Sequence, residues 1–275
     1  MATNNLMFHE TFQPELTYIS KVLELAVAGE RGDKFQISAL SGIPTGEKKG
    51  KVEPHIKYAK YMGLIDYHVE KGIYTLSATK LGLKVWEQDK YLHELLTVWL
   101  LHYCISRDML GAPQWEYIVK KANVGFNLDV SNSHLNSLIQ KEFDISNGDV
   151  QKAFGVVKSS YMSGCFSSIY YLAWEENLAY EEKSEQIEYE FVYAYALLDS
   201  WSMLFPEKTE LTMPEITDDL MFGKVFGLSD DEIDAILESL QDKGVISINR
   251  QLFPITIVKT MDTEEVISNL YSMLM

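Results

Sequence analysis

Five lysines lie between residues 48 and 60, and their charge is the first feature of this sequence that suggests a chemistry. Only two acidic residues, Glu47 and Glu53, accompany them. Ammonium groups attract phosphate oxygens and release the counterions that surround a nucleic acid. Hydroxyl and aromatic side chains nearby can add contacts to phosphates or base edges. We therefore predict a DNA-binding surface made of Thr45, Lys48, Lys49, Lys51, His55, Lys57, Tyr58, Lys60 and Tyr61.

The charge of the whole chain is distributed unevenly. Residues 1–84 hold 11 Lys and Arg against 9 Asp and Glu, which gives 11 − 9 = +2, whereas the whole chain carries −16 and residues 85–275 therefore carry −18. This asymmetry is expected if one face meets a polyanion and the remainder does not. A lysine run can also be an ordinary solvated loop, and the same fold can bind proteins, so both alternatives stay open.

DNA cleavage is a second chemistry that the sequence allows. It usually needs carboxylates that hold Mg²⁺ or Mn²⁺ and a group that activates water. His9 and Glu10 are the candidate catalytic residues, with Asp89, Glu94 or His102 as a partner from elsewhere in the chain. In the structural alternative, Glu10 caps or pairs with the first helix, while Glu94 and His102 satisfy polar atoms around a buried helix.

Other enzyme signatures find little support. Glu47-Lys48-Lys49 has an acid-x-Lys spacing and Asp33 precedes it, but restriction-type sites place such residues on adjacent strands, and here they fall in a predicted turn. The chain has no His-Glu-x-x-His motif, no phosphate-binding Gly-Lys-Ser/Thr loop and no nucleophile elbow.

The lysines sit within residues 35–84, whose pattern is that of a helix-turn-helix followed by a β-wing. A helix at 15–28 precedes it, and the second helix of the motif begins near Pro54, where Ile56, Ala59 and Gly63 form a buried stripe. On the same helical wheel Lys57, Tyr58 and Tyr61 should face outward, with His55 beside them. Strands at 64–69 and 73–76, joined by a turn at 70–72, complete the wing.

The rest of the chain reads as helical, with a second wing at the end. Residues 91–106 predict a buried central helix, and the acidic stretch 175–190 predicts a solvated segment facing away from any phosphate backbone. After a linker at 206–210 and a turn at 223–228, an acidic helix capped by Ser229 precedes strands at 245–248 and 255–258. That helix is too acidic for DNA, so we expect a structural or protein-facing role.

The predicted fold is therefore mainly α with small β-wings. We expect an N-terminal winged helix-turn-helix domain at 1–88, a central helical domain at 89–205 and a C-terminal winged-helix-like unit at 206–275. Hydrophobic residues make up 47% of the chain, which excludes general disorder. Residues 1–12 lack the pattern of a secretory signal, and the longest apolar run, 95–105, is too short to cross a bilayer. A cytoplasmic protein with no membrane association is expected.

Four islands of sequence resemble a bacterial family catalogued as a domain of unknown function, number four thousand and seven. They are His9-Glu10-Thr11-Phe12, the lysine-rich region 42–64, the region 76–99 with Thr79, Asp89 and Trp99, and the late segment 223–228. They occur in the same order as in the family and span nearly the whole chain.

The resemblance implies a role in bacterial DNA modification and phage defence. Similar proteins belong to DNA phosphorothioation systems of the Ssp type, where they are thought to bind and nick DNA. It also implies double-stranded DNA and two kinds of protein as partners, one similar to phosphoadenylyl-sulfate reductases and one similar to ATPases. A DNA-reading module, a sequence-specific nickase that uses Mg²⁺ or Mn²⁺, and a non-catalytic, regulator-like scaffold that docks a sulfur-transfer enzyme all remain open.

Overall fold

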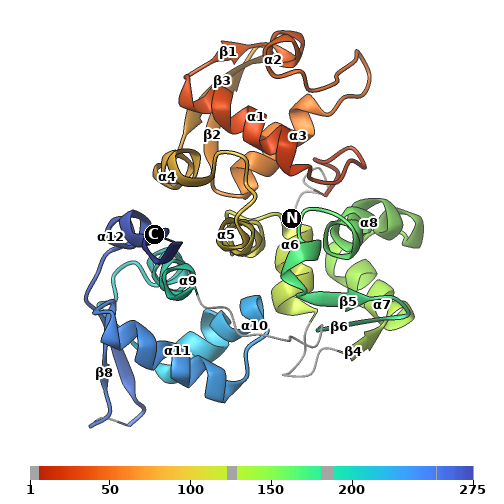
Figure 1. Cartoon of the computed structure of the whole chain (residues 1–275). Helices are drawn as coiled ribbons and strands as arrows, with labels where there is room; N and C mark the ends of the chain where they lie inside the picture. The colour runs from red at the N-terminus through yellow and green to blue at the C-terminus, as the bar shows by residue number, and fades with distance from the viewer. Residues whose placement is uncertain (1–5, 123–128, 181–188, 252, 275) are drawn as a thin grey trace. The chain divides into compact units, whose positions relative to one another are not determined.

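The computed structural model describes residues 6–122, 129–180, 189–251 and 253–274. The chain forms two compact units. Unit 1 comprises Met1–Ser106 and Leu110–Glu182, and unit 2 comprises Arg107–Met109 and Lys183–Met275. Each unit is mainly helical, and the described residues form two small antiparallel sheets in unit 1 and one in unit 2 (Figure 1). The predicted fold class is confirmed at this level, and the boundaries at 88 and 205 stay predictions.

The first part of unit 1 alternates helices and short strands. Its elements are α1 (Leu16–Val27), β1 (Arg31–Gly32), α2 (Lys34–Ser41), α3 (Val52–Tyr61), β2 (Ile65–Glu70), β3 (Ile73–Ala78) and α4 (Lys80–Asp89). The strands form an antiparallel sheet in the order β1-β3-β2. The short strand β1 joins the sheet because Arg31 and Gly32 pair with Thr75 and Tyr74 of β3.

Local signals explain where these helices begin and end. The carboxylate of Asp33 accepts hydrogen bonds from the N–H groups of Phe35 and Gln36, and the side-chain oxygen of Gln36 accepts one from the N–H of Asp33. Thr79 caps α4 by accepting from the N–H of Gly82 at 2.9 Å. Its hydroxyl also donates to the carbonyl of Gly63 at 2.6 Å, so the cap of α4 is fastened to the chain just after α3.

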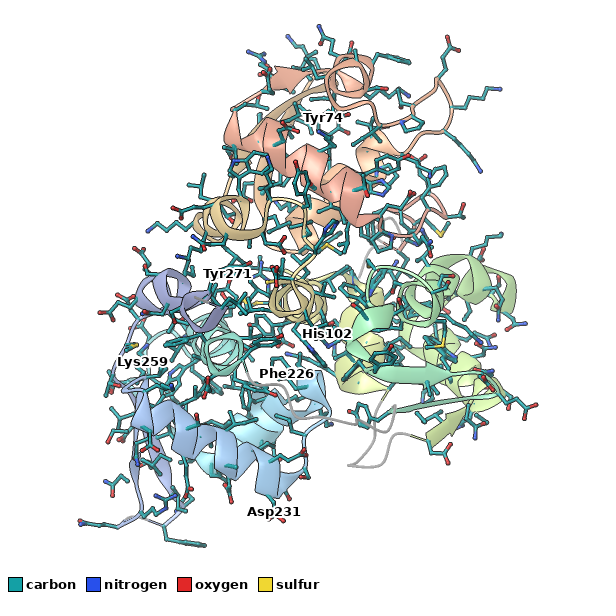
Figure 2. All side chains as sticks on the ribbon, viewed as in Figure 1. Tyr74, His102, Phe226, Asp231, Lys259 and Tyr271 are labelled. Carbon is teal, nitrogen blue, oxygen red and sulfur yellow. The ribbon has the colours of Figure 1, made fainter. Side chains whose placement is uncertain are left out.

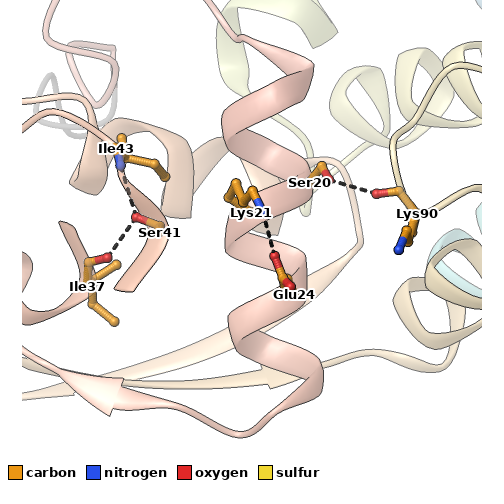
Figure 3. A network of polar contacts seen from close by, with 7 residues as sticks. All are labelled: Ser20, Lys21, Glu24, Ile37, Ser41, Ile43 and Lys90. Carbon is orange, nitrogen blue, oxygen red and sulfur yellow. Dashed lines mark hydrogen bonds and ion pairs between the residues drawn. The ribbon is translucent and has the colours of Figure 1, made fainter. Parts of the chain in front are cut away.

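Further side-chain bonds fasten α1 and α2 to their surroundings (Figure 3). The hydroxyl of Ser20 in α1 donates to the carbonyl of Lys90 at 2.7 Å, just after α4. At the end of α2, the hydroxyl of Ser41 donates to the carbonyl of Ile37 and accepts from the N–H of Ile43. The second bond fixes the direction in which the chain leaves α2 toward α3.

The second part of unit 1 surrounds a buried helix. Its elements are α5 (Leu95–Ser106), α6 (Pro113–Glu116), a π-helix (Tyr117–Lys121), β4 (Asp129–Ser131), α7 (Asn132–Phe143), α8 (Asn147–Met162), a 3-10 helix (Ser167–Ile169), β5 (Leu172–Trp174) and β6 (Asn177–Tyr180). Every residue of α5 after Leu95 is buried, as predicted for the central helix. The carboxylate of Asp89 accepts from the N–H groups of His93 and Glu94, which precede α5.

Unit 2 repeats the strand order of the first part of unit 1. Its elements are α9 (Glu190–Leu204), β7 (Glu210–Thr212), a π-helix (Glu215–Asp219), α10 (Phe222–Phe226), α11 (Asp230–Asp242), β8 (Ile246–Asn249), β9 (Thr256–Lys259), α12 (Thr263–Asn269) and a 3-10 helix (Ser272–Leu274). Its sheet has the order β7-β9-β8, which matches β1-β3-β2. The predicted cap at Ser229 is confirmed, because Ser229 and Glu232 form a reciprocal capping box.

One expectation for this region is wrong. The segment 223–228 is not a turn, because most of it belongs to the short helix α10. The expected linker at 206–210 runs up to β7, whose first residue, Glu210, pairs with Val258 of β9. In the described parts of both units, no helix combines the length and the apolar character needed to cross a bilayer.

Gly82 lies where α4 packs closely against the chain that follows α3. A Cβ atom at this position would lie 1.9 Å from the backbone oxygen of Leu64, which cannot move away as a flexible side chain could. We expect Gly82→Ala to lower the free energy of unfolding by more than about 2 kcal/mol in urea denaturation.

Gly148→Ala in α8 is the matched control, since a Cβ there meets only the hydroxyl oxygen of Ser146 at 3.8 Å. A Gly82→Ala variant as stable as this control would contradict the packing described here.

Candidate nucleic-acid interface

The lysine loop, residues 44–51, closes on itself between α2 and α3. The N–H of Lys51 donates to the carbonyl of Pro44 at 2.8 Å, and the ammonium of Lys34 donates to the carbonyl of Glu47 at 2.9 Å. The hydroxyl of Thr45 fills the space beside Gly50, where a Cβ would come within 2.3 Å of it. These contacts hold the loop in one shape, with Thr45 partly covered inside it.

Lys48 and Lys49 are exposed on the lysine loop. Neither makes an ion pair or a hydrogen bond through its ammonium group with any residue in the described part of the chain. Two consecutive lysines without an ion pair in the described chain are therefore exposed on the lysine loop of unit 1.

Helix α3 presents a different face from the one expected. His55 and Tyr58 are fully buried, so the prediction that they lie on the outward surface is wrong. The predicted inner stripe of Ile56 and Ala59 is confirmed. Lys57 and Tyr61 are only partly exposed, and Lys60 is exposed.

The buried polar groups of α3 hold an N-terminal segment that we call the strap, residues 6–15. The hydroxyl of Tyr58 donates to the carbonyl of Phe12 at 2.8 Å. The Nε2 atom of His55 accepts from the N–H of Glu15 at 3.2 Å, while its Nδ1 lies 2.6 Å from the carbonyl of Lys51. This pattern requires a neutral imidazole with its proton on Nδ1, because Nε2 must offer a lone pair.

Two of the five lysines are engaged by carboxylates. The ammonium of Lys51 lies 2.7 Å from Glu15, and the hydrogen bond to this carboxylate raises the pKa of Lys51. The ammonium of Lys60 lies 3.3 Å from Asp66 at the start of the wing. Lys57 makes no ion pair with the residues described by the structure. Of the five lysines in the predicted surface, only Lys48, Lys49 and Lys57 have no ion pair among the described residues.

The candidate catalytic pair lies in the strap. His9 is fully buried, and its Nδ1 accepts from the N–H of Thr11 at 2.9 Å. Its Nε2 is buried without a hydrogen-bond partner within the geometric limits among the described residues, although the backbone of Leu6 and Ala153 lies close enough to the imidazole to affect its pKa. Burial lowers the pKa of His9 to about 4, so the imidazole is neutral near pH 7.

Glu10 follows in an unusual conformation. Glu10 and Thr11 have φ angles of +50° and +73°, in the left-handed region that non-glycine residues rarely adopt. One carboxylate oxygen of Glu10 is buried without a hydrogen-bond partner among the described residues. The alternative expectation of a cap or ion pair on the first helix is not met in the described chain, because the residue preceding α1 is Glu15.

Two of the three proposed partners of this pair are occupied elsewhere, and the third, Glu94, is exposed. The carboxylate of Asp89 binds backbone N–H groups before α5, and Nδ1 of His102 lies 2.7 Å from the hydroxyl of Tyr161. Within 6–122, 129–180, 189–251 and 253–274, no three His, Cys, Asp or Glu side chains gather as metal ligands would. The described residues therefore provide no group of three protein ligands for Mg²⁺ or Mn²⁺ at His9 and Glu10.

The acidic regions lie apart from the lysine loop in the sequence. Asp230, Asp231, Asp234, Glu238 and Asp242 on α11 are exposed, and Asp231 is labelled in Figure 2. Glu175 and Glu176 are exposed too. Most of the acidic stretch predicted to be solvated, residues 181–188, lies outside the described residues.

The two buried histidines predict a pH dependence of stability. Burial lowers the pKa of both imidazoles, for His9 from 6.5 to about 4. The unfolded chain takes up these protons near pH 6.5, whereas the folded chain does not. The contribution of the neutral histidines to the free energy of unfolding is therefore fully present above pH 6.5 and is lost as the pH falls toward 4. For His9 alone the loss approaches about 3 kcal/mol.

Urea denaturation at pH 7 and at pH 5 measures this loss. We expect His9→Gln/His55→Gln to flatten the difference between the two pH values, and His68→Gln, which changes an exposed residue of β2, to leave it unchanged. An equal pH dependence in the double variant and in the wild type would show that other groups are responsible.

Comparisons with known proteins give the fold. No protein-family model matches the chain, and no curated protein sequence matches it, so the resemblance to the family of unknown function stays a prediction. Two solved structures match over 98% of this chain and 87% of their own, at 15% sequence identity: a magnesium ion-bound SspB with a TM-score of 0.77 and a second SspB crystal structure with a TM-score of 0.76. The chain therefore has the fold of SspB.

Proposed function

We propose that this chain is a cytoplasmic DNA-binding protein of a bacterial DNA phosphorothioation system that acts in phage defence. The system is suggested by the SspB fold over nearly the whole chain, together with the family resemblance in the sequence. The observation that carries DNA binding is that Lys48 and Lys49 are exposed on the closed lysine loop and form no ion pair with any residue that the structure describes.

The first part of unit 1 is, in this proposal, a winged helix-turn-helix domain. Support comes from its element order, in which α1, α2 and α3 precede the hairpin β2–β3. In such domains the third helix approaches the major groove. Lys57 is the side chain of α3 that we assign to base edges, while Lys48 and Lys49 bind phosphates. His55 and Tyr58 shape this surface from beneath.

Unit 2 has the same sheet order but the opposite charge. The exposed carboxylates of α11 would repel a phosphate backbone, so we assign DNA to unit 1 and a protein partner to unit 2. A sulfur-transfer enzyme similar to phosphoadenylyl-sulfate reductases, or an ATPase-like protein, is the partner that the resemblance implies. If unit 1 does not bind DNA, the chain is a non-catalytic scaffold for these partners.

DNA nicking is a second candidate activity, and two features of the strap support it. Consecutive left-handed residues store strain, and such strain gathers at functional sites. Among the described residues, Oε2 of Glu10 and Nε2 of His9 are buried without a hydrogen-bond partner, and these two residues are adjacent in the strap. SspB has been crystallised with magnesium, whereas the described residues of this chain do not form a metal site, so we derive no reaction step through a metal.

Charge reversal in the lysine loop tests DNA binding. We expect Lys48→Glu/Lys49→Glu to weaken binding to a labelled DNA duplex by at least about tenfold at low salt, and to reduce the slope of log K against log salt by about two, because two phosphate contacts are lost. Fluorescence anisotropy over a salt series measures both quantities.

Lys141→Glu/Lys243→Glu is the matched control, since both lysines are exposed and the net charge changes by the same amount. Equal weakening in both double variants would mean that only total charge matters. Duplex binding that is unaffected by the Lys48/Lys49 change would favour the scaffold.

A supercoiled-plasmid assay tests nicking. With Mg²⁺ or Mn²⁺ present, we expect the wild type to convert supercoiled plasmid to open circles and Glu10→Ala to lose most of this activity. Glu24→Ala, which removes an exposed carboxylate of α1, should nick like the wild type. Nicking by Glu10→Ala at the wild-type rate would exclude Glu10 as the catalytic group.

A further inference from the structure

Two hollows flank helix α8 in unit 1. The larger, of about 380 Å³, lies between α8 and the strap and is lined by Thr11, Gln13, Gln151, Lys152, Gly155, Val156 and Ser159. The smaller, of about 130 Å³, is lined from α7, α8 and β5, with Trp174 on one side. Gln151 and Gly155 line both hollows, so the backbone of α8 at Gly155 forms the ridge between them.

Gly155 has no packing reason to be glycine. It lies in the middle of the 16-residue helix α8, where glycine costs roughly 0.5–1 kcal/mol relative to alanine. A Cβ at this position would meet no heavy atom within 4 Å, and the φ angle of Gly155 is not in the left-handed region. A bare helix backbone facing open space suits the close approach of a ligand.

The lining of the larger hollow has the chemistry of a phosphate-binding surface. None of the residues around either hollow is Asp or Glu, although the chain contains 40 acidic residues and carries a net charge of −16. Donors from Thr11, Gln13, Gln151 and Lys152 line the larger hollow. Lys152 also pairs with Asp149 at 3.3 Å, but both side chains are exposed and such a pair contributes little.

The strap connects the larger hollow to the lysine loop. Thr11 and Gln13 lie on either side of Phe12, whose carbonyl is held by Tyr58 of α3. The ammonium of Lys51, the last residue of the lysine loop, lies 5.8 Å from the centre of the Phe12 ring. Figure 1 shows the strap, in red, between the chain that links α2 to α3 and helix α8.

We propose that the sugar-phosphate backbone of bound DNA crosses α8 at Gly155, with its phosphates in the hollow between α8 and the strap. This inference rests on the proposed function, namely that the chain binds DNA through the lysine loop. It adds a second contact, made by hydrogen-bond donors around a bare helix backbone, that extends the footprint beyond the winged part of unit 1.

Filling the hollow tests the inference. Gly155→Leu places a side chain in open space within a helix and should not lower the melting temperature, because leucine favours the helix more than glycine does. It should weaken binding to a fluorescein-labelled DNA duplex by about tenfold through loss of charge-assisted hydrogen bonds to phosphate. Gly148→Leu makes the same change in the first turn of α8, outside both hollows, and should bind within about twofold of the wild type.

A second variant keeps the test independent of how well Gly155→Leu folds. Lys152→Gln removes one exposed charge and should reduce the slope of log K against log salt by about one. If Gly155→Leu and Lys152→Gln both bind like the wild type while Lys48→Glu/Lys49→Glu binds weakly, the α8 contact is wrong and the proposed function stands. If the Lys48/Lys49 variant also binds like the wild type, the proposed function itself is wrong.

Discussion

The attachment of the strap to α3 determines which side chains of unit 1 can meet a ligand. Tyr58 donates a hydrogen bond to the carbonyl of Phe12, and His55 accepts one from the N–H of Glu15. The carboxylate of Glu15 in turn forms an ion pair with the ammonium of Lys51. Because these contacts cover one side of α3, the helix offers only Lys57 and its neighbours on the other side. The same contacts bring Thr11 and Gln13 to α8, so the strap joins the lysine loop to the hollow at Gly155.

Electrostatics divides the chain between two roles. Residues 1–84 carry +2 and the remainder carries −18. Both units contain a sheet with the same strand order, yet the helix before the hairpin carries exposed lysine in one unit and exposed carboxylates in the other. Shared topology therefore does not imply a shared ligand. The charge on the helix surface is what supports assigning DNA to unit 1 and a protein partner to unit 2.

Local rules made much of the fold predictable from the sequence. Caps at Thr79 and Ser229 and the glycine that ends α3 mark helix boundaries through short-range hydrogen bonds and backbone preference, and the buried helix α5 follows from its continuous apolar sequence. The two-residue strand β1 carries no periodic signal, since it is defined only by pairing with β3. Strand β7 was missed for the same reason, because it depends on β9.

The candidate site was only partly predictable. Lys48 and Lys49 could be identified because a charged loop needs no tertiary partner to stay exposed. The inward direction of His55 and Tyr58 could not, because their acceptors and donors belong to the strap, far away in the sequence. Gly155 gave a weak signal as a glycine inside a helical pattern, and only the structure shows that the space beside it is open.

Acetylation of lysines with and without a short DNA duplex measures which lysines DNA covers. We expect DNA to protect Lys48, Lys49 and Lys152, which belong to the lysine loop and to α8, and to leave the exposed Lys243 of unit 2 as reactive as before. Protection confined to unit 2, or reactivity of Lys48 and Lys49 unchanged by saturating DNA, would contradict this expectation.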